Sequence, residues 1–161
     1  MINLRSFEVP TVVKHAPGAI QLLADQIKAL GSKRPMLVTD KGLVNAGLVN
    51  EAMDSLKAGN VDYVLFDGVV PNPDIKLVDD AAAIFASEGC DGLIGFGGGS
   101  PMDTAKSIGV VSQNGGSILD YEWADPQPIK KRIPPMIAVP TTAGPGSEVT
   151  LWAVITDPKR K

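Results

Sequence analysis

The sequence has one cysteine, one histidine and no excess of positive charge. A single cysteine cannot form an intrachain disulfide, so nothing points to an oxidising compartment, and Cys90 is expected to be a small core residue. Fifteen Lys and Arg side chains against 18 Asp and Glu give a net charge of −3, which supplies no broad positive field. Nucleic acid is therefore not expected as a partner.

Long apolar runs are missing too. No stretch approaches the length of a membrane span, and the first residues, MINLRSFEVP, lack the basic segment and apolar core of a secretory signal. We expect no membrane association and a cytoplasmic location. The 161 residues are 44% apolar and 20% charged, which fits one globular domain with a single substantial core.

Short apolar, β-branched runs alternate with segments of helical period along the chain. Helices are expected over residues 18–30, 49–59 and 78–89, strands over residues 35–39, 63–66, 93–96, 136–139 and 149–156, and a long surface loop over residues 112–135. The alternation predicts an α/β fold, a Rossmann-like, mostly parallel sheet flanked by helices. The strand at 93–96 is apolar throughout, which is typical of a central strand covered on both faces.

The glycine-rich turn Gly97-Gly98-Gly99-Ser100 leaves the end of that central strand. Consecutive glycines bring backbone N–H groups close to a ligand, and the following helix adds the positive end of its dipole. The turn is therefore predicted to hold phosphate, although a tight turn would also use glycine. The usual fingerprint G-x-G-x-x-G fails at its last position, where Ser100 stands.

Several polar residues near this turn have two interpretations. Ser100 can cap the helix, with Pro101 in its first position and Asp103 completing a capping box, and the same residues can touch a ligand. Asp40 follows the strand at 35–39, where a carboxylate accepts hydrogen bonds from ribose hydroxyls and repels a 2′-phosphate. That role favours NAD over NADP, but an N-cap or loop acid fits the position equally well.

A second polar segment follows the strand at 136–139. It is rich in small hydroxyl side chains, which donate hydrogen bonds to phosphate or ribose. An ordinary polar loop has a similar composition. Its candidate binding residues are Thr141, Thr142, Ser147 and Thr150.

Four motifs, in order over nearly the whole chain, resemble the N-terminal domain of the iron-dependent (group III) alcohol dehydrogenases. They are Thr39-Asp40-Lys41, Gly68-Val69-Val70-Pro71-Asn72-Pro73, Gly97-Gly98-Gly99-Ser100-Pro101-Met102-Asp103 with Ala105-Lys106, and Pro140-Thr141-Thr142-Ala143-Gly144 with Gly146-Ser147-Glu148-Val149-Thr150. Members of that family transfer hydride between a primary alcohol or aldehyde and NAD(P), with a divalent metal between this domain and a helical second one. The resemblance implies a dinucleotide-binding domain over residues 1–161.

The resemblance also implies roles for individual residues. Asp40 binds the adenosine ribose, and Asn72 lies near the cofactor. Asp103 lies toward the nicotinamide end. The pyrophosphate is held by Gly97, Gly98, Gly99 and Ser100, and the phosphate and ribose path is lined by Thr141, Thr142, Ser147 and Thr150.

The sequence departs from the family in two places. Pro145 stands where the family usually has a threonine, which removes a hydroxyl and an amide donor. The family's metal ligands, one aspartate and three histidines, belong to the helical second domain and none is present here; His15 alone cannot hold a metal. We expect Fe²⁺ or Zn²⁺ only in a complete protein, and a chain that ends within a β-hairpin.

Three functions remain open from the sequence. The chain is expected to be the NAD-binding half of a metal-dependent alcohol dehydrogenase, in a homo-oligomer such as a dimer, with a small alcohol or aldehyde as substrate. It could instead be a non-catalytic nucleotide-binding or oligomerising module. A relative of glycerol dehydrogenase or dehydroquinate synthase shares the same first-domain layout.

Overall fold

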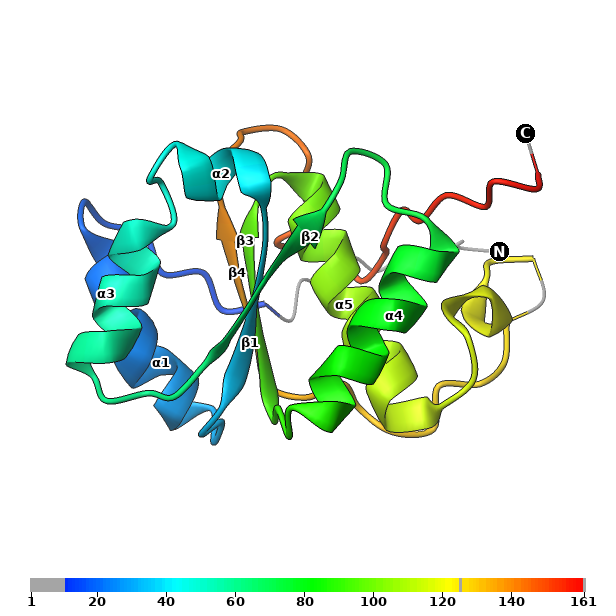
Figure 1. Ribbon diagram of the computed structural model, residues 1–161, viewed down its shortest axis with the longest axis horizontal. Coiled ribbons are helices and arrows are strands. Elements are labelled where there is room, and N and C mark those ends of the chain that lie inside the picture. Colours follow the sequence, from blue (N-terminus) through cyan, green and yellow to red (C-terminus); the bar gives the residue numbers. More distant parts are fainter. Residues whose placement is uncertain (1–10, 125, 161) are drawn as a thin grey trace, which may run out of the picture.

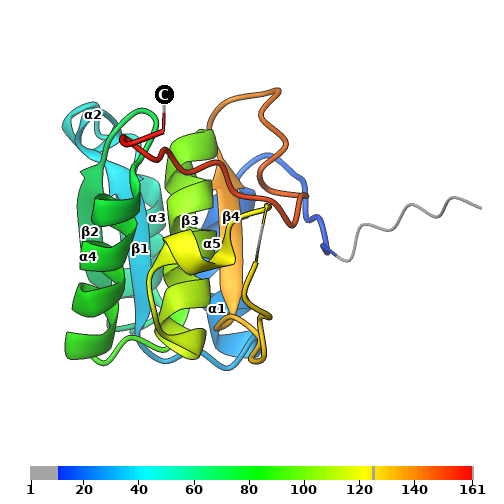
Figure 2. The same ribbon diagram turned by 90° about the vertical axis from the view of Figure 1, so that its right-hand side faces the viewer.

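A computed structural model describes residues 11–124 and 126–160. The centre is a parallel sheet in the order β2-β1-β3-β4, with helices on both faces (Figures 1 and 2). Its strands are β1 (Pro35–Asp40), β2 (Val64–Val69), β3 (Gly92–Gly97) and β4 (Met136–Pro140). The helices are η1 (Ala19–Leu22), α1 (Leu23–Ala29), α2 (Lys41–Asn45), α3 (Asn50–Ala58), α4 (Ile75–Ser87), α5 (Gly99–Asn114) and η2 (Ile118–Tyr121). The predicted α/β fold is confirmed.

Two hydrophobic clusters, one on each face of the sheet, form the core. On one face, Leu37 and Ile94 pack with residues of α1 and α3; on the other, Met36 and Val38 pack with residues of α4 and α5. Successive strand side chains point to opposite faces, so β1 and β3 are apolar almost throughout. This explains why the central strands were predicted correctly from their sequence.

The order of the strands creates a crevice at one edge of the sheet. The connection from β1 to β2 runs through α3 on one face, whereas the connection from β3 to β4 runs through α5 on the other. The two connections therefore diverge from the gap between β1 and β3. In open parallel sheets, ligands bind at the carboxyl ends of the strands beside such a point.

Helix α5 packs unusually close to β3. A Cβ on Gly95 would lie 3.0 Å from the Met102 Cα and 3.3 Å from the Ala105 Cβ. Because Met102 contributes a backbone atom to this contact, the helix could not relax around a larger side chain without moving. Gly95 thus allows α5 to pack this close to β3, which sets the position of the helix beside the strand.

The strand predicted at 149–156 is wrong. The described chain makes only an isolated bridge there, between Asp74 and Thr156. Leu151, Trp152 and Val154 are largely exposed, so these apolar side chains are not buried against a sheet.

The predicted loop at 112–135 begins too early. Helix α5 continues to Asn114, whose side-chain amide donates to the Val110 and Lys131 carbonyls, and the helix ends at Gly115, with φ +80°. Helix η2 then interrupts the loop. Cys90 is partly rather than fully buried. None of the described helices combines the length and apolarity needed to cross a membrane.

Candidate functional site

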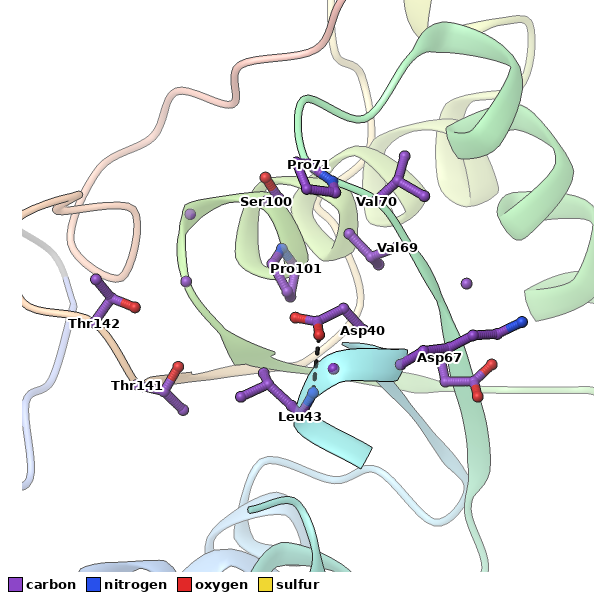
Figure 3. Close-up of a pocket in the computed structure, with 15 residues that line it drawn as sticks. Asp40, Leu43, Asp67, Val69, Val70, Pro71, Ser100, Pro101, Thr141 and Thr142 are labelled. Atoms are coloured by element: carbon purple, nitrogen blue, oxygen red, sulfur yellow. Dashed lines mark hydrogen bonds between the residues drawn. The ribbon is translucent and has the colours of Figure 1, made fainter. Parts of the chain in front are cut away.

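A cleft of about 700 Å³ opens at the carboxyl ends of the strands. Every strand contributes to it, because the loops after all four meet at this edge (Figure 3). Its lining residues are Asp40, Lys41, Gly42, Leu43, Asp67, Gly68, Val69, Val70, Pro71, Gly98, Gly99, Ser100, Pro101, Thr141 and Thr142. The cleft lies at the crevice that the strand order creates.

Asp40 ends β1 and caps the next helix. Its Oδ1 accepts a hydrogen bond of 2.9 Å from the Leu43 amide, as Figure 3 shows. A Cβ on Gly42 would lie 2.9 Å from the same oxygen, so glycine there leaves room for the carboxylate. The N-cap interpretation is confirmed. Asp40 also lines the cleft, and a carboxylate with two oxygens can cap α2 with one and accept from a ligand with the other.

The glycine-rich turn brings the first turn of α5 to the cleft. The N-cap is Gly98, which has no side chain to accept from the first amides of the helix. The predicted capping by Ser100 is wrong, because the helix already begins at Gly99. The free amides and the positive end of a 16-residue helix can hold an anion.

The polar segment after β4 lies against the other side of this turn. The Thr141 amide donates to the Gly97 carbonyl at 2.9 Å, which continues the pairing of β3 and β4. A Cβ on Gly98 would lie 3.5 Å from the Thr142 Oγ1, and one on Gly99 would lie 3.4 Å from the Ser147 Oγ. Glycine at 98 and 99 leaves open the space between the turn and these hydroxyls.

Other predicted site residues lie outside the cleft lining. Gly97 is buried at the end of β3, with φ +144°. Asn72 is exposed in the loop between β2 and α4, one residue beyond the lining residue Pro71. Asp103 is buried on α5 and paired with Lys106, which also contacts Thr150.

Part of the cleft lining was not predicted from the sequence. Lys41, Gly42 and Leu43 lie in the turn after β1, and the stretch from Asp67 to Pro71 lies at and beyond the end of β2. The general position of ligand sites in parallel sheets would have found the β2 end, given the strand assignments. No chemical signal marks apolar residues such as Val69, which line the cleft through their place in the fold.

A metal site needs three or four converging ligands. Within residues 11–124 and 126–160, no group of three or more His, Cys, Asp and Glu side chains comes together in that way. The described residues therefore do not fit the divalent metal that the resemblance implies. They do fit a phosphate-bearing ligand, through the open glycines and the uncapped end of α5.

Fold and cleft together define a Rossmann-like α/β domain with a site at the carboxyl edge of its sheet. The family model of iron-containing alcohol dehydrogenases matches residues 10–161. The chain belongs to the iron-containing alcohol dehydrogenase family.

Individual relatives agree with that assignment. A choline dehydrogenase of Bacillus subtilis (strain 168) is 49% identical over all of this chain and 40% of its own length. The crystal structure of a 1,3-propanediol oxidoreductase has a TM-score of 0.88 at 38% identity, with 96% of this chain and 41% of that one covered. The sulfoacetaldehyde reductase of Bifidobacterium kashiwanohense, in complex with NAD⁺, has a TM-score of 0.87 at 32% identity over 97% of this chain and 41% of that one. The chain thus spans about 40% of the length of these relatives.

Proposed function

We propose that this chain is the cofactor-binding part of an NAD-dependent alcohol dehydrogenase. The observation that carries the proposal is the uncapped N-terminus of α5, which opens into the cleft beside Gly98 and Gly99. The family supports it, as does the similar reductase solved with NAD⁺.

The cofactor's parts correspond to separate regions of the cleft. Its pyrophosphate binds the first amides of α5, next to Gly98, Gly99 and Ser100. Its adenosine ribose donates to Asp40, whose negative charge disfavours the 2′-phosphate of NADP. Thr141 and Thr142 donate to the phosphates from the end of β4.

The proposed reaction moves a hydride between the alcohol carbon and C4 of the nicotinamide. As the alcohol is oxidised to an aldehyde, NAD⁺ becomes NADH and the hydroxyl proton passes to solvent. The role of these residues is to bind and orient the cofactor. No step through iron or zinc is assigned to them, because the described residues bring no set of metal ligands together.

A fluorescence titration with NADH tests the proposal on this chain, with ADP and NADPH as competitors. We expect saturable binding, with NADH bound more tightly than either ADP or NADPH. Equal competition by ADP would favour a nucleotide-binding module that makes no use of the nicotinamide half. Absence of saturable NADH binding would contradict the proposal.

A further inference from the structure

The segment from Thr150 to Val154 has no regular secondary structure, yet it follows a defined path across α5 (Figure 2). Little apolar surface of the segment is buried, because Leu151, Trp152 and Val154 are 84%, 63% and 75% exposed. Its flanks are tied by backbone hydrogen bonds, from the Val149 amide to Gly146 and from the Thr156 amide to Pro73. Within the segment, the Trp152 ring also packs against the Trp123 ring, with centroids 4.8 Å apart, and polar contacts hold the residues on either side.

A largely buried ion pair on α5 supplies these polar contacts. The side chains of Lys106 and Asp103 are 13% and 8% exposed, and the Lys106 Nζ lies 3.2 Å from the Asp103 Oδ1. The same Nζ donates to the Thr150 Oγ1 at 3.3 Å and to the Trp152 carbonyl at 2.7 Å. The other carboxylate oxygen, Oδ2 of Asp103, accepts from the Val154 amide at 3.0 Å.

The hydrogen-bonding capacity of this pair is directed to the segment. A lysine ammonium has three donors, and here each has a partner: Asp103, Thr150 and Trp152. A buried charge that loses one such partner is left under-compensated, so the contacts are strongly interdependent. The pair therefore tethers the segment through both of its side chains, and no donor of Lys106 is left for a ligand.

The tethered segment lies on a particular side of the cleft. Strand β3 lies between β1 and β4, so the glycine turn has Asp40 on one side and the segment after β4 on the other. Ser147, in the segment after β4, lies against Gly99. If Asp40 takes the adenosine and the turn takes the pyrophosphate, the remaining half of a dinucleotide must extend toward the side of Thr150.

We propose that Lys106 is a positioning residue for the nicotinamide half of the cofactor, acting through Thr150 and the backbone of Trp152 rather than by touching the cofactor. The inference rests on the proposed function. It assigns Asp103 the same indirect role, because both of its oxygens already have partners within the chain.

The test compares NADH and ADP affinities in Lys106→Met, which keeps much of the alkyl stem and removes the ammonium. We expect the Kd for NADH to rise about tenfold, the effect of losing charge-assisted hydrogen bonds, while the Kd for ADP stays the same. Lys106→Arg, which still carries donors and charge, is expected to retain most of the NADH affinity. Unchanged NADH binding in Lys106→Met, or equal losses for NADH and ADP, would overturn the proposal.

Two further variants complete that test. Lys76→Met is the matched control, because Lys76 is an exposed lysine on α4 that also pairs with an aspartate, Asp80. It is expected to change neither affinity. Thr150→Val leaves the buried pair intact, so it serves where Lys106→Met does not fold; it too should weaken NADH and spare ADP.

Amide hydrogen exchange provides a readout that needs no cofactor. In Lys106→Met, the Val154 amide should exchange at least about tenfold faster, because its acceptor Asp103 is no longer held. Unchanged exchange at Val154 would overturn the tether itself. If the wild-type chain binds neither NADH nor ADP, the proposed function fails and the positioning role fails with it, whereas exchange at Val154 still decides whether Lys106 and Asp103 hold the segment.

Discussion

At the scale of single residues, Asp40 caps α2, and we propose that it also binds the adenosine ribose; one substitution separates these two roles. Asparagine is as good an N-cap as aspartate, so Asp40→Asn should keep the bond to the Leu43 amide and change the free energy of unfolding by less than about 0.5 kcal/mol. Losing the negative charge should weaken NADH binding about tenfold and narrow the preference for NADH over NADPH. Fluorescence titrations with both nucleotides measure this.

Asp74→Asn is the matched control for that prediction. Asp74 caps α4 through the Leu77 amide in the same geometry, at 2.8 Å, but does not line the cleft. It should leave both nucleotide affinities unchanged. An Asp40→Asn chain with wild-type discrimination between NADH and NADPH would argue against a ribose contact by Asp40.

Position 97 requires glycine for both a conformational and a steric reason. Its φ is +144°, and a Cβ there would lie 2.7 Å from the Pro101 Cγ and 2.9 Å from the Leu43 Cδ1. Gly97→Ala should lower the free energy of unfolding by about 3 kcal/mol, from backbone strain and overpacking combined. Gly144 has φ +114° but open space around it, so Gly144→Ala should lose about 1 kcal/mol. Urea unfolding compares them; equal losses would contradict the steric part.

The thiol of Cys90 should ionise at a higher pH in the folded chain than in the unfolded one. Partial burial raises its pKa from 9.0 to about 11, so at about pH 8 the folded chain should carry about a hundredfold less thiolate than the unfolded one. A thiol reagent should therefore label the native chain far more slowly than the chain in concentrated urea. The folded state holds this proton more tightly, so its stabilising contribution is present below about pH 9 and is lost as the pH rises toward about 11. Equal labelling rates for the native chain and the chain in urea would contradict the raised pKa of Cys90.

At the scale of elements, the unit of β3 and α5 sets the position of the site. Gly95→Ala would place a methyl group 3.0 Å from the Met102 Cα, which should destabilise the fold by about 1–3 kcal/mol. Gly98→Ala is the control for stability, since its Cβ meets the Thr142 Oγ1 at an ordinary 3.5 Å. Thermal unfolding measures both. A Gly95→Ala chain as stable as wild type would mean that α5 shifts freely on the sheet.

Elements with a strong local pattern were predictable from the sequence, and those that depend on a partner were not. Strands β1 and β3 are apolar almost throughout because both of their faces are covered, so their pattern in the sequence corresponds directly to their place in the sheet. The segment at 149–156 has strand-like residues, but among residues 11–124 and 126–160 it pairs only through the bridge at Thr156, and backbone pairing cannot be read from composition. The predicted start of α5 is two residues late, because Gly98 rather than Ser100 takes the N-cap position.

At the scale of the whole molecule, the topology assembles a site from segments far apart in the sequence. Asp40, Gly98 and Thr141 meet because β1, β3 and β4 are parallel neighbours with their carboxyl ends at one edge. The sequence predicted these residues as candidate binding residues through their motifs. It could not supply the tether at Lys106, whose partners Thr150 and Trp152 lie more than 40 residues away along the chain.

Amide hydrogen exchange with and without saturating NADH tests whether the cleft binds a dinucleotide. We predict slower exchange in the peptides around residues 40–43, 98–101 and 141–142, with α1 and α3 unchanged, because the first amides of α5 gain phosphate as an acceptor. Unchanged exchange at 98–101 under saturating NADH, or protection only on another face, would contradict it.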